Sequence, residues 1–234
     1  MKSYAFIFAR GNSKGLPGKN IKLLLGKPLI QYSIEVAFKT SGIDKVFVST
    51  DDEYIAKVSR SLGAIIIDRP LDLAKNDSPE WQAWKHAVNW VKERFGSFEQ
   101  FVSLPTTSPL RSVKDVESAM LKRSSIGADT CIAITPSSRN PYFNIVKSSN
   151  KKNFIELVNK PPNVISRRQD APEVFDITTV VYVVNVEFIM KNNSLFDGNV
   201  TSIKVPKHRA IDIDDIHDFN FVESILNNTS DKED

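Results

Sequence analysis

The sequence predicts an α/β fold in three layers, with a mostly parallel sheet covered by helices on both faces. Two observations support this prediction. Short apolar runs alternate strictly with helical patterns over the first 135 residues, which is typical of successive βαβ units. The first apolar run also leads directly into a loop rich in glycine and basic residues, ARGNSKGLPGKN, at the sheet edge where such folds bind ligands.

The composition fits one compact domain. Of 234 residues, 41% are hydrophobic and 25% are charged, as in average globular domains. The 31 basic and 28 acidic side chains are too balanced for a nucleic-acid binder, which usually carries a basic stripe. No apolar run approaches the roughly 20 residues of a membrane span, and the N-terminal run is too short for a signal peptide. We therefore expect a soluble, cytoplasmic protein with neither nucleic-acid nor membrane partners.

The elements of the first half follow from hydrophobic periodicity. We expect strands at 4–9, 45–50, 64–70, 101–104 and 130–135, and helices at 28–40, 51–63, 79–96 and 113–124. In the third of these helices, Trp81, Trp84, Val88 and Val91 fall at offsets of 0, 3, 7 and 10, which places them on one core-facing side of a helix. The lone cysteine, Cys131, lies in an apolar run and is expected to be buried.

Local signals mark several helix ends. Gly63 suits the position just after a helix, and Ser78 before Pro79 reads as an N-cap followed by proline at the first helical position. Thr50 and Glu53 have the spacing of a capping box, which explains the acidic pair Asp51 and Asp52 without a functional role.

The alternation breaks at Pro136 and resumes at residue 176. Residues 137–175 are polar and irregular, and a structureless loop of this length is uncommon in a compact domain. We expect a hairpin-like extension that finds its partner elsewhere, most simply in a second subunit. A strand at 176–185, a helix at 186–196, a strand at 202–206 and a final helix should then complete the domain, with a frayed tail at 228–234.

The loop after the first strand has the physical character of a phosphate cradle. It matches neither the Walker pattern nor the dinucleotide pattern, because Ser13 stands where each requires glycine. Gly11, Gly15 and Gly18 nevertheless allow backbone amides to approach an anion, and Arg10, Lys14 and Lys19 supply positive charge. The alternative is a flexible, solvated surface turn.

A second candidate feature is Ile211-Asp212-Ile213-Asp214. On a strand, this alternation would bury both isoleucines and place both carboxylates on the opposite face. Two such carboxylates suit a hard divalent cation bound to phosphate oxygens. The alternative is that Asp214 or Asp215 only caps the following helix.

A third candidate is PTTSPLR, residues 105–111, which follows the fourth strand. Its hydroxyls and arginine suit a polar anionic ligand, although a plain loop ending in an N-cap at Ser112 would look similar. His86, His208 and His217 show neither metal-ligand spacing nor a triad.

Taken together, ARGNSKGLPGKN, VSTDDEYIAKVSRSLGA, DRPLDLA, PTTSPLR and AIDIDDIHDF resemble, in order and spacing, the CMP-sialic acid synthetases, also called acylneuraminate cytidylyltransferases. The resemblance covers about residues 3–227. It implies a Rossmann-like fold of the nucleotide-diphospho-sugar transferase type, with a nucleotide-binding catalytic domain at 1–136 and 176–227 and a dimerisation arm at 137–175. It also implies an enzyme that joins CTP to the anomeric hydroxyl of a 3-deoxy-2-keto sugar acid, releases pyrophosphate, uses Mg²⁺ and forms a homodimer.

The resemblance assigns site residues by position. Arg10, Lys19 and Asp212 would be catalytic, and Asp212 and Asp214 would hold the metal. The nucleotide would contact Arg10, Gly11, Asn12, Ser13, Lys14, Lys19, Asn20, Arg69 and Ser78. The sugar acid would contact Pro105, Thr106, Thr107, Ser108, Arg111, Arg168, Gln169, Asp176 and Thr178.

The departures from the family pattern lie on the sugar side. Pro105 replaces a common glutamine, Asp176 stands where an arginine often lies, and TTVVY at 178–182 replaces NGAIY. The acceptor is therefore open among N-acetylneuraminate, a related nonulosonic acid such as legionaminic acid, and an octulosonic acid. A sugar-1-phosphate nucleotidylyltransferase and a non-catalytic nucleotide sensor are the competing interpretations of the whole chain.

Overall fold

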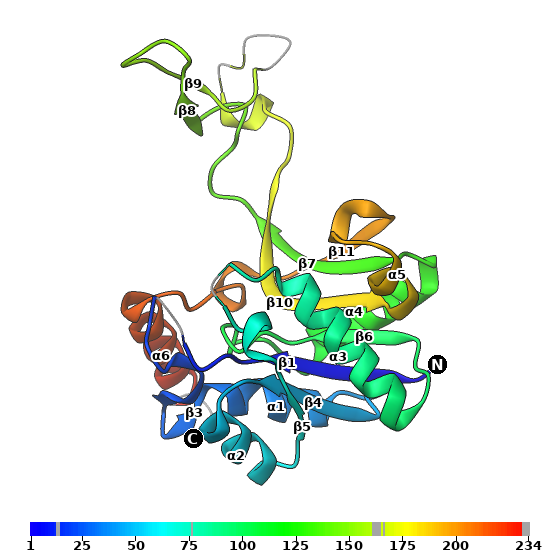
Figure 1. The fold of residues 1–234 in the computed structure, drawn as a ribbon. Coiled ribbons are helices and arrows are strands. Elements are labelled where there is room, and N and C mark those ends of the chain that lie inside the picture. Colours follow the sequence, from blue (N-terminus) through cyan, green and yellow to red (C-terminus); the bar gives the residue numbers. More distant parts are fainter. Residues whose placement is uncertain (13–14, 76, 161–164, 166, 231–234) are drawn as a thin grey trace.

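The computed structural model describes residues 1–12, 15–75, 77–160, 165 and 167–230, and its centre is one twisted sheet (Figure 1). Seven strands in the described part of the chain are ordered β11-β7-β10-β6-β1-β4-β5. Strand β10 is antiparallel to both of its neighbours, whereas the other pairs are parallel. The strands are β1 (Ser3–Phe8), β4 (Lys45–Thr50), β5 (Ile65–Asp68), β6 (Gln100–Ser103), β7 (Thr130–Pro136), β10 (Phe175–Asn185) and β11 (Val200–Lys204).

Helices cover both faces of this sheet, so the predicted three-layer α/β fold is confirmed. The apolar sides of α1 (Leu29–Lys39), α2 (Glu53–Ser61) and α4 (Val113–Ile126) pack into one core. Those of α3 (Glu80–Phe95) and α5 (Val186–Lys191) pack into the other. Along β1, Ala5 and Ile7 belong to the first core and Tyr4 and Phe6 to the second, as expected for a strand buried on both faces.

The four residues predicted on one side of α3 are core residues. Trp81, Trp84, Val88 and Val91 are 8%, 3%, 0% and 0% exposed, and Cys131 is also buried. None of the helices in the described residues is long and apolar enough to cross a membrane.

Two helix starts differ from the prediction. Helix α2 is capped by Asp52, whose side chain accepts from the Ile55 amide, rather than by a capping box beginning at Thr50. Helix α3 begins at Glu80, with Pro79 as its N-cap and no side-chain cap, because the Ser78 hydroxyl donates to the Asp72 carbonyl instead. The predicted end of α2 at Gly63 (φ +91°) is confirmed. Ser112, considered as a possible helix start, is the N-cap of α4.

The start of α4 carries a partly buried ion pair that predicts a pH-dependent loss of stability. Arg209 donates to both carboxylate oxygens of Asp115, at 3.2 and 2.7 Å, and Asp115 also completes the capping box with Ser112. Burial alone would raise the pKa of Asp115, but the hydrogen bonds from Arg209 and Ser112 outweigh this and lower the pKa. Asp115→Asn should therefore reduce the free energy of unfolding by about 2 kcal/mol at neutral pH.

The sign of the pH dependence follows from this lowered pKa. The Asp115 contribution is fully present above the ordinary aspartate pKa of 3.8 and is lost as the pH falls through the lowered value. Urea unfolding of wild type and Asp115→Asn should therefore show a difference at pH 7 that shrinks on acidification. Glu93→Gln, an exposed acid on α3, is the matched control, and a difference that is constant with pH would contradict this account.

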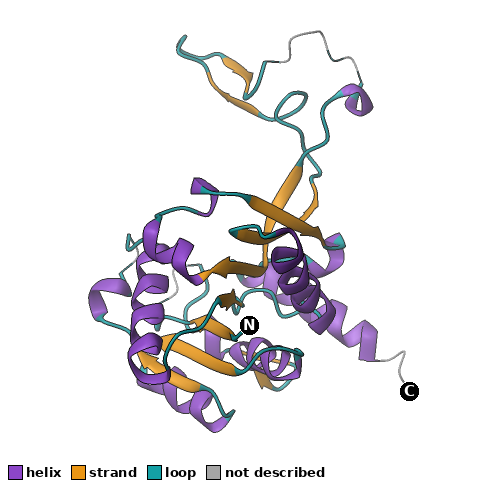
Figure 2. Ribbon diagram, turned by 90° about the vertical axis from the view of Figure 1, so that its right-hand side faces the viewer, coloured by secondary structure: helices purple, strands orange, loops and turns teal. Residues whose placement is uncertain are grey.

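The described residues between β7 and β10, 137–160, 165 and 167–174, leave the sheet and form an arm that projects from the body (Figures 1 and 2). The arm carries a short hairpin of β8 (Val146–Ser148) and β9 (Ile155–Leu157) and a 3-10 turn at Arg168–Asp170. Phe154 and Ile155 on this hairpin are 66% and 71% exposed. The hairpin-like extension agrees with the prediction, and its pairing with a second subunit stays a prediction.

The C-terminal region departs from the prediction in two ways. Residues 211–214 form no regular element and pair with no strand among the described residues, so the strand geometry considered for this segment is wrong. Helix α6 (Ile216–Ser230) continues past the start of the frayed tail predicted at 228, and residues 231–234 lie outside the described residues. Apolar residues of α6, including Phe219 and Val222, pack with Leu24, Leu29 and Ile213 in a third core.

Candidate active site

The segments after β1, β5 and β6, together with Asp214, line two adjoining hollows at one edge of the sheet. The first has a volume of about 290 Å³, and we call it the nucleotide hollow because Arg10, Arg69 and Ser78, which the sequence analysis assigned to the nucleotide, line it. The loop hollow has a volume of about 460 Å³. Phe8 and Arg10 line both hollows, so together these form a continuous site along the end of β1.

The nucleotide hollow is centred on a fixed arginine. Arg69, only 9% exposed, donates from Nε to Ser49 Oγ at 3.1 Å and from Nη2 to the Ser49 carbonyl at 2.6 Å. Its guanidinium also lies 5.4 Å from the centre of the Phe8 ring, and burial lowers its pKa to about 10. The hollow is lined by Phe8, Arg10, Arg69, Leu73, Lys75, Ser78, Glu80 and Ala83.

The loop hollow places Lys19 beside an acidic segment. Lys19 Nζ donates to the Ile213 carbonyl at 2.7 Å and lies 3.7 Å from Asp214 Oδ1. The buried Asn20 donates to the Arg10 carbonyl at 2.9 Å and accepts from the Thr106 hydroxyl at 2.6 Å. This hollow is lined by Phe8, Arg10, Gly15, Lys19, Asn20, Pro105, Thr106, Thr107 and Asp214.

The loop between β1 and Lys19 is held by the elements around it. The Gly11 amide donates to Asp51 Oδ1 at 3.1 Å, and Arg10 Nη1 donates to the Lys75 carbonyl at 3.1 Å. A Cβ on Gly15 would lie 2.2 Å from the Asp214 carbonyl oxygen, so only glycine permits this close backbone approach. The predicted nucleotide ligands Ser13 and Lys14 lie outside the described residues.

The two predicted metal ligands are held differently from each other. The Ile213 amide donates to the Thr107 carbonyl at 2.9 Å, and Ile213 is fully buried, which fixes the segment between Asp212 and Asp214. The Asp214 side chain is 80% exposed at the hollow. The cap of the following helix is Asp215, which accepts from the amides of His217 and Asp218, so Asp212 and Asp214 are free of that task.

The surroundings of Asp212 fit a cation. Its Oδ1 is buried and accepts no hydrogen bond from the described residues. Burial raises its pKa, and the neighbouring charge of Asp214 raises it further, while the hydroxyls of Thr107 and Thr179 and the charge of Lys19 oppose this. A partly buried carboxylate oxygen without a partner, close to a second carboxylate, fits a hard divalent cation that completes its shell with phosphate oxygens and water.

The loop 105–111 divides into residues that face the hollow and residues that support it from behind. Pro105, Thr106 and Thr107 line the hollow. Arg111, expected to face the sugar acid, is 4% exposed and donates to the carbonyls of Pro105, Thr179 and Val180 and to the Ser33 hydroxyl.

Three further residues of the predicted sugar set lie away from the hollow. Ser108 is fully buried, with its hydroxyl 2.7 Å from that of Thr179. Thr178 is also buried, and its hydroxyl donates to the Ala133 carbonyl at 3.3 Å. Asp176 is exposed near the start of β10. Ser108, Arg111 and Thr178 therefore form hydrogen bonds within the protein, behind the loop hollow, and do not line it.

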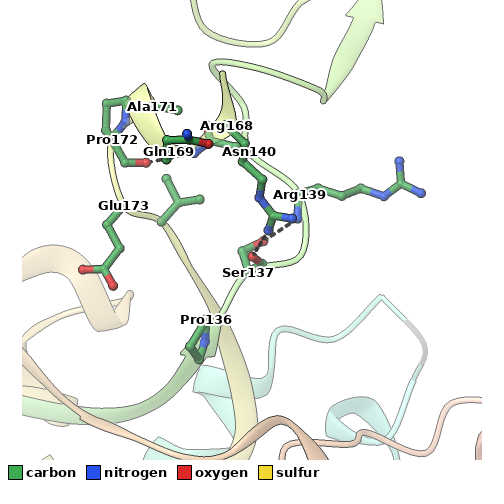
Figure 3. A pocket seen from close by; sticks show the side chains of 10 residues that line it. Pro136, Ser137, Arg139, Asn140, Arg168, Gln169, Ala171, Pro172 and Glu173 are labelled. Atoms are coloured by element: carbon green, nitrogen blue, oxygen red, sulfur yellow. Dashed lines mark hydrogen bonds between the residues drawn. The ribbon is translucent and has the colours of Figure 1, made fainter. Parts of the chain in front are cut away.

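The two predicted arm residues lie in a separate hollow of about 410 Å³ at the base of the arm, shown in Figure 3. Arg168 Nη2 donates to the Ser137 carbonyl at 3.0 Å, and Gln169, Arg139 and Asn140 also line this hollow. It shares no lining residue with the two hollows at the sheet edge. Within one chain, Arg168 and Gln169 are thus not brought together with Lys19 and Asp214.

Sequence reasoning did not identify several residues that build the site. Asp51, attributed to helix capping, instead anchors the Gly11 amide. Lys75 and Glu80 line the nucleotide hollow, but charged residues in a loop and in a first helical turn carry no local signal of such a role. The basic loop with its preceding strand was the signal that identified the correct edge of the sheet.

Comparison with known proteins gives relatives whose names agree with the family resemblance of the sequence. A sequence profile described as cytidylyltransferase matches residues 4–79. The CMP-N,N'-diacetyllegionaminic acid synthase of Campylobacter jejuni is 31% identical over 222 residues, which are 94% of this chain and 93% of that protein. The post-translational flagellin modification protein B of Campylobacter coli is 29% identical with the same coverage.

A solved structure shares the fold. That of a CMP:2-keto-3-deoxy-manno-octonic acid synthetase complexed with CTP matches with a TM-score of 0.73 at 17% identity, over 98% of this chain and 100% of that one.

Proposed function

The chain belongs to the CMP-sialic acid synthetase family of cytidylyltransferases, and on this premise we propose that it transfers the cytidylyl group of CTP to a nonulosonic acid. The products are a CMP-sugar, formed at the anomeric hydroxyl, and pyrophosphate. The observation that carries this proposal is the continuous pair of hollows joined at Phe8 and Arg10, with Lys19 and Asp214 beside one another in the second hollow. A nucleoside needs a hollow with fixed polar groups, and its phosphate chain needs basic side chains; the two hollows together supply both.

The chain's own residues divide the work of the reaction. The nucleoside occupies the nucleotide hollow beside Arg69, and the triphosphate extends past Arg10 toward Lys19. The sugar acid approaches from the side of Pro105 and Thr107, and its hydroxyl oxygen attacks the α-phosphorus as the bond to the β-phosphate breaks. Arg10 and Lys19 neutralise the charge that develops on the departing pyrophosphate, since positioning and electrostatics carry most of such transfers.

Asp212 and Asp214 are the residues that would hold Mg²⁺, as the unpartnered oxygen of Asp212 and the exposed carboxylate of Asp214 support. Bound there, Mg²⁺ would neutralise phosphate charge and lower the pKa of the attacking hydroxyl. Lys19 contacts the same segment through the Ile213 carbonyl, and this contact supports a site in which Lys19 and the two carboxylates would act on the same phosphate group.

The acceptor we favour is a nonulosonic acid of the legionaminic type. The relative named as a CMP-N,N'-diacetyllegionaminic acid synthase is 31% identical over most of both chains. Pro105, which departs from the N-acetylneuraminate pattern, lines the loop hollow. An octulosonic acid is the second candidate, and the likeness in fold to a synthetase for such an acid motivates its inclusion in the test.

Pyrophosphate release with a substrate panel tests the proposed function. CTP and Mg²⁺ are combined with N-acetylneuraminate, its deaminated analogue, legionaminate, pseudaminate or an octulosonate, and each reaction is repeated with ATP, UTP and GTP. We expect release with CTP and one nonulosonic acid. If no acid gives pyrophosphate release while CTP still raises the melting temperature, the result would contradict the transferase proposal and support a nucleotide sensor.

We further propose that the arm completes the site of a second copy in a homodimer. Arg168 and Gln169 lie in a hollow separate from Lys19 and Asp214, while exposed apolar residues on the hairpin, including Phe154 and Ile155, suit burial against another chain. Arg168 would then supply the guanidinium that a sugar carboxylate favours.

Deleting Ser148–Asn153 tests this arrangement. Loss of the hairpin end should weaken dimerisation and raise the KM for the sugar acid together, with the KM for CTP little changed, because the nucleotide hollow lies within one chain. Light scattering and steady-state kinetics provide the two measurements, and Lys151→Ser, which changes the same turn without shortening it, is the control. A fully active monomer would contradict the proposal.

A further inference from the structure

Glu80 is an acidic residue inside the nucleotide hollow that the proposed reaction does not use. It is the first residue of α3 and lines the hollow together with Arg69 and Phe8. Its Oε1 accepts from Trp84 Nε1 at 3.2 Å. Among the described residues, its side chain has no other hydrogen bond and no ion pair within 4.0 Å. The Trp84 indole thus orients the Glu80 carboxylate, and the carboxylate oxygens can accept further hydrogen bonds from a ligand in the hollow.

Arg69 presents complementary chemistry in the same hollow. Two of its nitrogens, Nε and Nη2, are committed to Ser49, whereas Nη1 donates to no described residue. Arg69 and Glu80 are near enough for their charges to affect the pKa of each other but do not form a direct ion pair. The hollow is therefore bordered by a hydrogen-bond donor, Arg69, and an acceptor, Glu80, that do not bond to each other.

The edge of cytosine matches this pair, and the edge of uracil does not. Cytosine offers an exocyclic N4 amino group as donor beside the acceptors N3 and O2, and carboxylates accept well from N4. Uracil has the acceptor O4 at the position of N4, which would face the Glu80 carboxylate and be repelled. A hollow built to hydrogen-bond one pattern discriminates strongly, because the wrong base leaves its polar groups unpaired.

We propose that Glu80 accepts from the cytosine amino group and so makes the enzyme select CTP over UTP, with Trp84 positioning the carboxylate. This inference rests on the proposed function, since it deepens the role of the nucleotide hollow. Partial removal of the carboxylate from water at the wall of the hollow raises the pKa of Glu80, and the Trp84 indole and the Arg69 charge offset only part of this rise. The charge of Glu80 also contributes, after burial, to raising the pKa of Tyr182 to about 12.

Nucleotide binding by Glu80→Gln tests the proposal. Titration calorimetry of the full chain with CTP and with UTP, without a sugar acid, gives the ratio of the two affinities. The glutamine side chain can present its amide donor to uracil O4, so the ratio should fall by about 10- to 100-fold. Glu93→Gln, the same change on the exposed part of α3, should leave the ratio unchanged, and Trp84→Phe should lower it less than Glu80→Gln does.

The outcomes separate this inference from the proposed function. An unchanged ratio in Glu80→Gln would overturn the inference, and so would an equal loss of affinity for both nucleotides, which would indicate a ribose contact or a general effect on the hollow. Wild-type protein that binds CTP no better than UTP would overturn the cytidylyl assignment and, with it, the role of Glu80. Melting temperatures within a few degrees of wild type confirm that the variants are folded.

Discussion

Asp214→Asn is expected to lower the turnover number by about 100-fold or more at saturating Mg²⁺, because the metal-binding pair that we propose, Asp212 and Asp214, would lose one carboxylate. The fold should be unaffected, since the Asp214 side chain is 80% exposed and its only ion pair with a described residue is the 3.7 Å contact with Lys19. Steady-state kinetics with CTP and the identified acid, over a range of Mg²⁺ concentrations, provide the measurement. Asp212→Asn should have an effect of similar size.

The neighbouring aspartate provides the control. Asp215 caps α6 through the amides of His217 and Asp218, so Asp215→Asn keeps a good capping residue and should retain near-normal turnover. A wild-type turnover number in Asp214→Asn would remove these aspartates from the metal role. An equal fall in all three variants would indicate a general disturbance of the segment.

Arg111→Met is expected to have the largest effect on stability, with a loss of about 3–5 kcal/mol in the free energy of unfolding. The guanidinium is 4% exposed and donates to the carbonyls of Pro105, Thr179 and Val180 and to the Ser33 hydroxyl. Methionine fills much of the volume but leaves these acceptors buried without a donor, which costs free energy. Burial lowers the pKa of Arg111 to about 9, in keeping with a charge that is removed from water.

Urea unfolding and thermal melting measure this loss. For a chain of this size the melting temperature should fall by roughly 10 °C. Arg60→Met removes an arginine that is 58% exposed and paired only loosely with Glu53 at 3.8 Å, so it should change stability by less than about 1 kcal/mol. If the two substitutions lowered the free energy of unfolding equally, the buried hydrogen bonds of Arg111 would not be the cause of the loss.

The fold was predictable because its determinants are local and periodic. The alternating apolar runs identified the sheet strands in the first half of the chain, and the spacing of Trp81, Trp84, Val88 and Val91 identified the core side of α3. The glycine-rich basic loop identified the functional edge, because ligands bind at the carboxyl ends of parallel strands whatever the sequence of the loops.

The parts that failed depend on contacts between distant residues. An alternating Ile-Asp-Ile-Asp segment has the period of a strand, but a strand also needs a neighbouring strand with free backbone groups. Among the described residues, the Ile213 amide donates to the Thr107 carbonyl in a loop, and the Ile213 carbonyl accepts from the Lys19 side chain. The side on which the Arg111 side chain lies is decided by carbonyls nearly 70 residues away on β10. Local sequence contains neither kind of information.

The contact between the loop hollow and residues 211–214 has a consequence for synthesis. Lys19 donates to the Ile213 carbonyl across 194 positions of sequence, and the Gly15 backbone fits closely against the Asp214 carbonyl. During synthesis on the ribosome, residues 15–19 therefore emerge long before the residues that they contact. The two sides of the loop hollow can meet only after residue 214 has been made.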